Sequence, residues 1–450
     1  MELQKIIKGI ITGSKPLILS ASFLLASNVS IADSNPLATA DQLELDNKSI
    51  SIYENYGFKV LRAKADIVYK VAYGLFVSDE AKPLLEPMID ELVFSSIQKS
   101  VNNDVYHPKV YWVNSAPRNW FNINVPGGRY SYDNPDVIYR TIPISSNFHY
   151  VLHGKRSAGG VADATFSLVS NPNSQKTVEL LTGDKLAINA DGTYDITIDS
   201  DPANGRINHI QSTSSAVQLF VRNSLGDWQK NTPDALSIEI LEDVSGYPER
   251  SNTRIYMNTL KNLSESTFFY GVGALGIKTK TNAVNTFKQP EQSDDLGTLV
   301  SQASSFGHFK IEDDEALIVT INQGGASYFI VPATNPWTIT VSPGAIQCSL
   351  NNAQAIADAD GQYRFVISLT DPGVHNWISS SNLHEGTMML RWQNLPATAP
   401  ASGAAAVSTE LVKLADLPAK LPAETVWLTR SERINELQNR TQGYLRRVAF

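Results

Sequence analysis

The sequence predicts a mainly β protein with two tandem antiparallel β-sandwich or jelly-roll domains, and with helical segments before, between and after them. Segments whose apolar residues alternate with period two fill residues 139–240 and 316–392, as expected for half-buried strands. Turn dipeptides such as Asp191-Gly192 and Asn204-Gly205 separate these segments. Strand patterns do not alternate with helical ones, which argues against a parallel sheet. A chain of 450 residues also exceeds what one hydrophobic core usually supports.

Two stretches of the chain resemble each other and predict that a sheet-forming unit is repeated. In the second stretch, Asp360 opens a hairpin turn, Asn376 follows after 16 positions and Arg391 after another 15. The corresponding residues of the first stretch, at spacings of 17 and 14 positions, are Asp191, Asn208 and Arg222. Matching order and spacing favour duplication of a whole supersecondary unit. The alternative is that two unrelated β-meanders share Asp-Gly turns.

The second stretch carries the most specific motif of the chain. It reads Asp371-Pro372-Gly373-Val374-His375-Asn376-Trp377-Ile378, followed by His384-x-Gly386 and Arg391-Trp392. This motif resembles the C-terminal signature of bacterial exported proteins with a domain of unknown function of the 1214 type, often paired with one of the 1254 type. Upstream, Asp133-Asn134-Pro135-Asp136 and Ile138-Tyr139-Arg140 are similar to the start of that family's first β-domain. The resemblance implies β-sandwich domains with helical connections and no particular activity. The first copy departs from the pattern, because His209 stands where the second copy has Trp377.

The N-terminus has the composition of a secretory signal peptide. Lys5, Lys8 and Lys15 precede an apolar run at residues 16–26, and small residues up to Ala32 provide a cleavage site. The run is shorter than the ~20 residues that a membrane-spanning helix needs. We therefore expect a periplasmic or secreted protein without a transmembrane segment after cleavage; an uncleaved anchor is the alternative.

The same patterns predict the domain boundaries. Helical periodicity appears at residues 63–100, after a polar stretch at 34–47 that we expect to be a loose lead-in. The run from Gly271 to Gly276 matches a dinucleotide fingerprint by letters but follows a helical stretch, so we interpret it as close helix packing. The predicted segments are a signal peptide at 1–32, a helical N-terminal segment at 33–103, a first β-sandwich at 104–245, a helical connection at 246–315, a second β-sandwich at 316–397, and a linker with a C-terminal helix at 398–450.

Charge and cysteine content limit the classes of partner. A net charge of −8 and a pI near 5.5 argue against nucleic-acid binding, which needs a basic face. Cys348 is the only cysteine, so an intramolecular disulfide is excluded, and its alternating context predicts a buried thiol. His149 and His153 stand on a predicted strand, too far apart for an easy shared metal site. We therefore predict neither a metal nor a cofactor.

The bends of the second stretch carry the best collection of functional side chains. His384 or His375 could serve as a general base, with Arg391 stabilising negative charge. The residues predicted to bind a ligand there, by stacking or hydrogen bonding, are Asp371, Asn376, Trp377 and Trp392. The alternative for each is a structural role, such as an amide that bonds the backbone of a turn.

A second candidate group lies on a Pro-rich and Gly-rich loop. Its predicted ligand-binding residues are Asn134, Asp136, Tyr139 and Arg140. An amide, a carboxylate, a phenol and a guanidinium close together can line the mouth of a pocket, although Asn-Pro-Asp also fits ordinary turn chemistry.

Three functions are compatible with these residues. The preferred one is an exported protein that binds a small or oligomeric organic ligand, sugar-like or anionic and amphipathic, at the second β-domain. The alternatives are a hydrolase or lyase acting at the same site with a histidine base, and an envelope or assembly module. Self-association into a homo-oligomer is left open.

Overall fold

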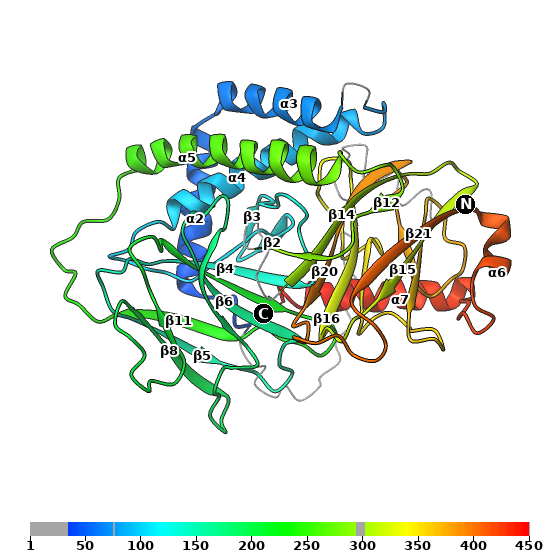
Figure 1. Ribbon diagram of the computed structural model, residues 1–450. Helices are drawn as coiled ribbons and strands as arrows, with labels where there is room; N and C mark the ends of the chain where they lie inside the picture. Colours follow the sequence, from blue (N-terminus) through cyan, green and yellow to red (C-terminus); the bar gives the residue numbers. More distant parts are fainter. Residues whose placement is uncertain (1–34, 75–76, 294–301, 450) are drawn as a thin grey trace, which may run out of the picture. The chain divides into compact units, whose positions relative to one another are not determined.

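We describe a computed structural model of the protein over residues 35–449, without residues 75–76 and 294–301 (Figure 1). The predicted fold class is confirmed: several antiparallel sheets dominate, with helices near the N-terminus, between the two β-regions and near the C-terminus. The described residues belong to one compact unit, Asn35–Ala449. The predicted signal peptide, residues 1–32, lies outside the described residues.

The first sandwich pairs a five-stranded sheet with a four-stranded sheet. The strand orders are β1-β4-β10-β6-β7 and β11-β5-β8-β9. Apolar side chains of both sheets, such as Phe166, Ile196 and Leu219, form the core between them. The strands are β1 (Tyr111–Val113), β4 (Val137–Pro143), β5 (Tyr150–Lys155), β6 (Asp163–Val169), β7 (Thr177–Thr182), β8 (Thr193–Asp199), β9 (His209–Gln211), β10 (Gln218–Ser224) and β11 (Ala235–Ile240). A separate ribbon pairs β2 (Arg118–Trp120) with β3 (Ile123–Val125).

The second sandwich has its own two sheets and its own core. The strand orders are β12-β14-β20-β16-β17, with β13 also beside β14, and β19-β18-β15-β21. Phe365, Leu390 and Trp392 are among the core residues. The strands are β12 (Thr286–Phe287), β13 (Glu291–Gln292), β14 (Gln302–Lys310), β15 (Glu315–Asn322), β16 (Tyr328–Thr334), β17 (Ser349–Asn351), β18 (Tyr363–Ser368), β19 (Trp377–Ser379), β20 (Glu385–Gln393) and β21 (Ala406–Lys413).

The two sandwiches share one topology, which confirms the predicted repeat. Strand β10 in the middle of the first large sheet corresponds to β20 in the second, and the order β11-β5-β8-β9 corresponds to β21-β15-β18-β19. Even the exceptional parallel pair is repeated, as β8 with β9 and β18 with β19. Arg222 of β10 and Arg391 of β20 therefore occupy equivalent positions in equivalent strands.

The second sandwich extends beyond its predicted boundaries at 316 and 397. Strand β14 begins at Gln302, inside the stretch predicted as a helical connection, and β21 pairs with β15 after the Pro-rich and Ala-rich loop. Strand β14 reads QASSFGHFK, so it lacks the apolar alternation that marks a strand. All of its residues except the last are nevertheless buried.

The predicted loose lead-in is a helix. Helix α2 (Ala40–Asn55) begins after Thr39, whose side chain accepts a hydrogen bond from the backbone N–H of Gln42. The stretch is polar in sequence, but α2 buries one of its polar residues, Asp46. The Asp46 carboxylate accepts hydrogen bonds from Arg118 at 2.8 Å and from Trp120 Nε1 at 3.2 Å. A polar helix face can be buried when its groups are paired in this way.

The remaining helices lie along one side of the large sheets (Figure 1) or follow the second sandwich. The predicted close helix packing is confirmed, because a β-carbon added at Gly271 would lie 3.0 Å from Val68 Cγ1 of α3. The remaining helices are α3 (Lys59–Tyr73), the 3-10 turn η1 (Lys82–Leu84), α4 (Leu85–Val101), α5 (Asn252–Ser266), the π-helix η2 (Thr267–Thr279), the 3-10 turn η3 (Leu414–Asp416), α6 (Leu417–Lys420) and α7 (Arg430–Leu445). Within the described part of the chain, none of the helices has the length and apolar character needed to cross a bilayer.

A further core joins the helices to the large sheets of both sandwiches. It includes Leu92 of α4, Leu263 of α5, Phe220 of β10, Phe306 of β14 and Met389 of β20. The middle strands of the two repeats thus contribute to one shared core, and the cavity described next lies there.

Candidate functional site

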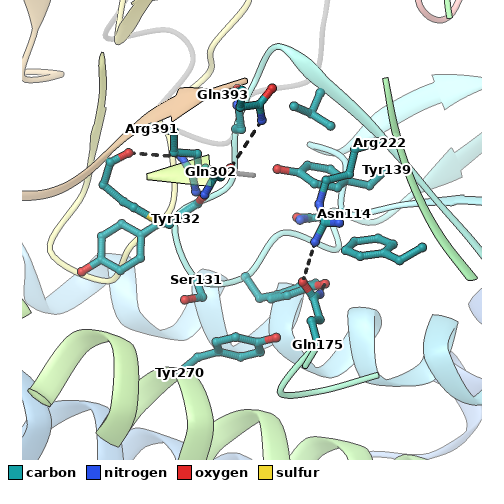
Figure 2. Close-up of a pocket in the computed structure, with 15 residues that line it drawn as sticks. Asn114, Ser131, Tyr132, Tyr139, Gln175, Arg222, Tyr270, Gln302, Arg391 and Gln393 are labelled. Atoms are coloured by element: carbon teal, nitrogen blue, oxygen red, sulfur yellow. Dashed lines mark hydrogen bonds between the residues drawn. The ribbon is translucent and has the colours of Figure 1, made fainter. Parts of the chain in front are cut away.

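A small cavity lies where the middle strands of the two repeats meet, and we call it the arginine cavity. Figure 2 shows Arg222 and Arg391 entering it from opposite sides. It has a volume of about 30 Å³, which is room for a small polar group. Its lining residues are Asn114, Tyr130, Ser131, Tyr132, Asn134, Val137, Tyr139, Gln175, Phe220, Arg222, Tyr270, Gln302, Met389, Arg391 and Gln393.

The two guanidinium groups of the arginine cavity contact only neutral oxygens among the described residues. Arg222 donates to Ser167 Oγ at 3.2 Å and to Gln175 Oε1 at 3.4 Å. Arg391 donates to the carbonyl oxygens of Met389, at 3.2 Å, and Tyr132. The side chains are 4% and 6% exposed, so solvent screens neither charge well.

Burial and mutual repulsion act on these charges. Burial lowers the pKa of Arg222 to about 10; the nearby phenols of Tyr139 and Tyr130 oppose this shift, and the charge of Arg391 adds to it. The guanidinium of Arg222 also lies 4.2 Å from the centre of the Phe220 ring, a cation–π contact that offsets part of the desolvation. A buried cation without an anionic partner is costly, so the arginine cavity favours a negatively charged guest.

Amides and phenols surround the two arginines. Gln175 Nε2 donates to the hydroxyl of Tyr130, and Gln393 Nε2 donates to Gln302 Oε1 at 3.4 Å. Asn114 Oδ1 is buried and has no hydrogen-bond partner among the described residues. Such groups can orient a polar guest without adding charge.

Three residues predicted as functional line the arginine cavity: Asn134, Tyr139 and Arg391. They come from two groups that the sequence analysis treated separately, and the structure brings them together. Burial raises the pKa of Tyr139, which therefore stays a neutral phenol at physiological pH. The sequence analysis did not predict four other lining residues as functional: Arg222, Tyr130, Gln175 and Asn114. The repeat could have indicated Arg222, because it aligns Arg222 with Arg391.

The other residues from the bends of the second stretch anchor the C-terminal helix instead of meeting Arg391. Asp371 accepts a hydrogen bond from Arg433 Nε of α7 at 2.9 Å, and the same guanidinium lies 5.3 Å from the Trp377 ring. Trp377 Nε1 donates to Ser368 Oγ at 3.0 Å. Trp392 is buried in the core of the second sandwich.

His375 and Asn376 line a separate pocket of about 20 Å³. The amide of Asn376 bonds the backbone N–H and carbonyl of Ile356, at 2.9 and 2.7 Å. His375 Nε2 lies 3.2 Å from the carbonyl oxygen of Gln354, and its Nδ1 lies 3.6 Å from Glu436 of α7. These contacts are the structural roles that the sequence analysis named as the alternative.

His384 has a different environment from Arg391, with which it was predicted to act. Its Nδ1 lies 3.0 Å from Glu80 Oε2 and its Nε2 lies 3.1 Å from Asp313 Oδ1. The hydrogen bond with Glu80 is the largest effect and raises the pKa of His384; burial opposes this rise, and the hydrogen bond with Asp313 adds to it. A histidine held by two carboxylates favours the imidazolium form, which is a poor general base.

Asp136 and Arg140, also predicted to bind a ligand, are buried in hydrogen-bond networks. Asp136 accepts hydrogen bonds from Trp228 Nε1 at 2.9 Å, Tyr328 Oη at 2.8 Å and Asn351 Nδ2 at 2.7 Å. Arg140 donates to the carbonyl oxygen of Asp234 at 2.5 Å and also to Asn223. Both side chains cross-link strands and loops through these contacts, although Arg140 Nε is buried without a hydrogen-bond partner among the described residues.

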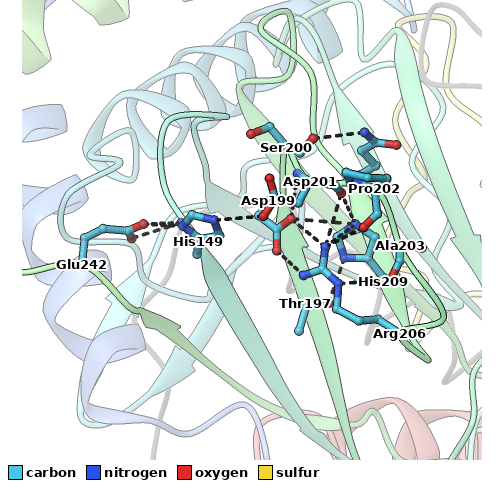
Figure 3. Close-up of polar contacts among 11 residues, drawn as sticks. His149, Thr197, Asp199, Ser200, Asp201, Pro202, Ala203, Arg206, His209 and Glu242 are labelled. Atoms are coloured by element: carbon cyan, nitrogen blue, oxygen red, sulfur yellow. Dashed lines mark hydrogen bonds and ion pairs between the residues drawn. The ribbon is translucent and has the colours of Figure 1, made fainter.

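A histidine and two carboxylates gather at one end of the first sandwich (Figure 3). Potential ligand atoms of His149, Asp199 and Asp201 lie within 4.8 Å of one another. Arg206 Nη1 already lies 2.6 Å from Asp199, and Glu242 lies 2.6 Å from His149 Nδ1. A cation would have to compete with the Arg206 guanidinium for the Asp199 carboxylate, so this cluster is satisfied by the protein's own charges.

In comparisons with known proteins, no family model and no curated protein matches the chain. Among solved structures, it is similar to an uncharacterised protein from Burkholderia cenocepacia, with 19% identity and a TM-score of 0.65; the match covers 82% of this chain and 99% of that one. It also matches a protein from Vibrio parahaemolyticus with 10% identity and a TM-score of 0.40, over 78% of this chain and 99% of that one. The first likeness shows that this fold occurs in an experimental structure.

Proposed function

We propose that the protein binds a small organic anion, with a carboxylate held between Arg222 and Arg391 in the arginine cavity. The observation that carries this proposal is the pair of buried guanidinium groups, at equivalent positions of the two repeats, that contact only neutral oxygens. A planar guanidinium donates two parallel hydrogen bonds to a carboxylate, and such charge-assisted bonds are stronger than those to neutral oxygens.

The lining of the arginine cavity favours binding over catalysis. Among the described residues, it holds no histidine, cysteine or carboxylate that could act as a base or nucleophile. Burial raises the pKa values of its phenols, including Tyr139 and Tyr130, so that they act as neutral hydrogen-bond donors. The volume of about 30 Å³ suits the head group of a ligand more than a large molecule.

Export and family membership are parts of the same proposal. The basic and apolar pattern of residues 1–32 supports action in the periplasm or outside the cell. The motif from Asp371 to Ile378 supports kinship with the proteins of the 1214 and 1254 types. Both rest on residue patterns.

The proposal predicts that carboxylates stabilise the protein and that their neutral amides do not. Thermal unfolding of the full mature chain would be followed with acetate, succinate and octanoate, each beside its amide, because a ligand that binds the folded state raises Tm by mass action. We expect a shift with at least one carboxylate and none with its amide.

Two variants and a matched control locate the effect. Arg222→Gln and Arg391→Gln should each abolish the shift, whereas Arg364→Gln should keep it, because Arg364 pairs with Asp358 and Asp360 away from the arginine cavity. Equal shifts with a carboxylate and its amide, or an unchanged shift in both cavity variants, would refute the proposal.

A further inference from the structure

A second cavity, which the proposed function does not use, is lined in part by Lys99, and we call it the lysine pocket. It has a volume of about 200 Å³ and lies between α4, the loop at 170–173 and α5. Its lining includes Lys99, Asn102, Asn173, Asn262, Lys261 and Glu265. The phenol rings of Tyr130 and Tyr270 separate Lys99 from the arginine cavity, because both lie near its amine and also line that cavity.

The fold prevents Lys99 from extending into solvent. Helix α4 is buried along its C-terminal half, on every residue from Glu91 to Val101, so Lys99 has no exposed helix face along which to reach water. Its side chain is 6% exposed. A lysine on an ordinary surface helix would instead place its ammonium in water.

The contacts of the Lys99 amine are neutral. Nζ lies 3.3 Å from Asn173 Oδ1, 3.3 Å from Ser266 Oγ and 4.2 Å from the centre of the Tyr130 ring. The carboxylate of Glu265, on the same pocket, is held by the amide of Asn173 at 2.9 Å. Glu265 therefore raises the pKa of the amine only from a distance.

Burial without an ion pair favours the neutral form of the Lys99 amine. Burial lowers the pKa of Lys99 to about 7, and the negative charge of Glu265 opposes this shift. About half of such amines are unprotonated at neutral pH, compared with fewer than about one in a thousand for an ordinary lysine. A neutral amine is the nucleophilic form of lysine.

We propose that Lys99 forms an imine with a small aldehyde or ketone that enters the lysine pocket. The Nζ lone pair forms a bond to the carbonyl carbon while the carbonyl π electrons move to oxygen, which takes up a proton. The nitrogen loses one proton to give a carbinolamine; the hydroxyl then takes up a second proton and leaves as water, the nitrogen loses its other proton, and a C=N bond replaces C=O. One carbonyl compound and one amine thus give one imine and one water, without an oxidant or reductant.

The lining of the lysine pocket indicates the class of carbonyl compound. Asparagine side chains provide both donors and acceptors, and the space of about 200 Å³ admits a molecule of a few carbons. We therefore expect a hydroxylated carbonyl compound, whose hydroxyl groups can bond the amides, in preference to an apolar one.

The test is reductive trapping on the folded full mature chain. Glycolaldehyde with cyanoborohydride would convert the imine into a stable secondary amine, and peptide mass spectrometry would locate it; ethylene glycol, which lacks the carbonyl, is the control ligand. We expect labelling of Lys99 to exceed that of Lys230, whose side chain is 80% exposed, by about ten-fold at pH 7. Lys99→Met should remove this adduct and leave that of Lys230 unchanged.

The pH dependence separates a reactive amine from a merely accessible one. The groups that face Lys99 are Glu265 and Ser266 of α5, Tyr270 of η2, and Asn173 and Tyr130 on loops. The ratio of Lys99 to Lys230 labelling should fall from pH 7 to pH 10, because ordinary amines become neutral only at the higher pH. Labelling of Lys230 before Lys99, a ratio independent of pH, or Lys99 labelled only in denaturant would each overturn the proposal.

Discussion

Arg222 and Arg391 differ from Arg118 and Arg129 in what balances their charge. All four side chains are buried. Arg118 lies 2.8 Å from Asp46, and Arg129 Nε donates to Glu91 at 2.8 Å. A buried ion pair is neutral as a unit, whereas a guanidinium bound only to neutral oxygens keeps its full charge in a poorly solvated place. The two arginines of the arginine cavity therefore lower the stability of the folded protein, and a bound anion would raise it.

This contrast predicts effects of different size for two similar substitutions. Arg129→Met should lower the free energy of unfolding by about 3–5 kcal/mol, because it leaves the Glu91 carboxylate buried without its partner. Arg222→Met should change the free energy of unfolding by less than about 1 kcal/mol, or raise it, because no carboxylate loses a partner. Urea unfolding of both variants without ligand checks this, and equal destabilisation would contradict the account.

At the scale of elements, side chains with functional chemistry join helices to sheets. The carboxylate of Glu80, between α3 and α4, and that of Asp313, between β14 and β15, hold the imidazole of His384 before β20. Asp371 and Trp377 similarly hold α7 through Arg433. The sequence analysis predicted catalytic roles for such residues from their types. A histidine near an arginine in the sequence has the same pattern whether its side chain contacts a substrate or another structural element.

The His384 contacts predict a pH-dependent contribution to stability. Because the pKa of His384 is raised in the folded protein, its contribution is fully present below the unfolded value near 6.5 and is lost as the pH rises through the folded value. The imidazole is 38% exposed, so screening limits the effect to about 1 kcal/mol or less.

Urea unfolding at a series of pH values measures this contribution. His384→Gln should remove a decline in stability that begins above about pH 6.5, and Asp313→Asn should make that decline smaller while Glu80 remains. An identical pH profile in wild type and His384→Gln would contradict this assignment.

At the scale of the whole molecule, the repeat places the arginine cavity. Two copies of one sandwich bring their middle strands, β10 and β20, to a shared core, so one guanidinium arrives from each copy. Alternating apolar residues and Asp-Gly turns were enough to predict both sandwiches and their repeat. The meeting of Arg222 with Arg391 could not be predicted in this way, because it depends on packing between residues 169 positions apart.

The strands and helices that the sequence analysis misplaced share a physical cause. Strand β14 and helix α2 bury polar side chains, such as Ser304, Ser305 and Asp46, that hydrogen-bond within the protein. Prediction from hydrophobic periodicity assumes that polar residues face water. It therefore fails where polar groups are buried and paired, and here those regions pack beside the shared core.

The central claim is that one anion contacts both arginines, and a double-mutant cycle on binding tests it most directly. Calorimetric titration with the best carboxylate would compare wild type, Arg222→Gln, Arg391→Gln and the double variant. We predict that each single change weakens binding by about ten-fold or more, as expected for a lost charge-assisted hydrogen bond. The loss in the double variant should differ from the sum of the two single losses, because both groups share one ligand. Unchanged affinity in either single variant, or two losses that simply add, would contradict the claim.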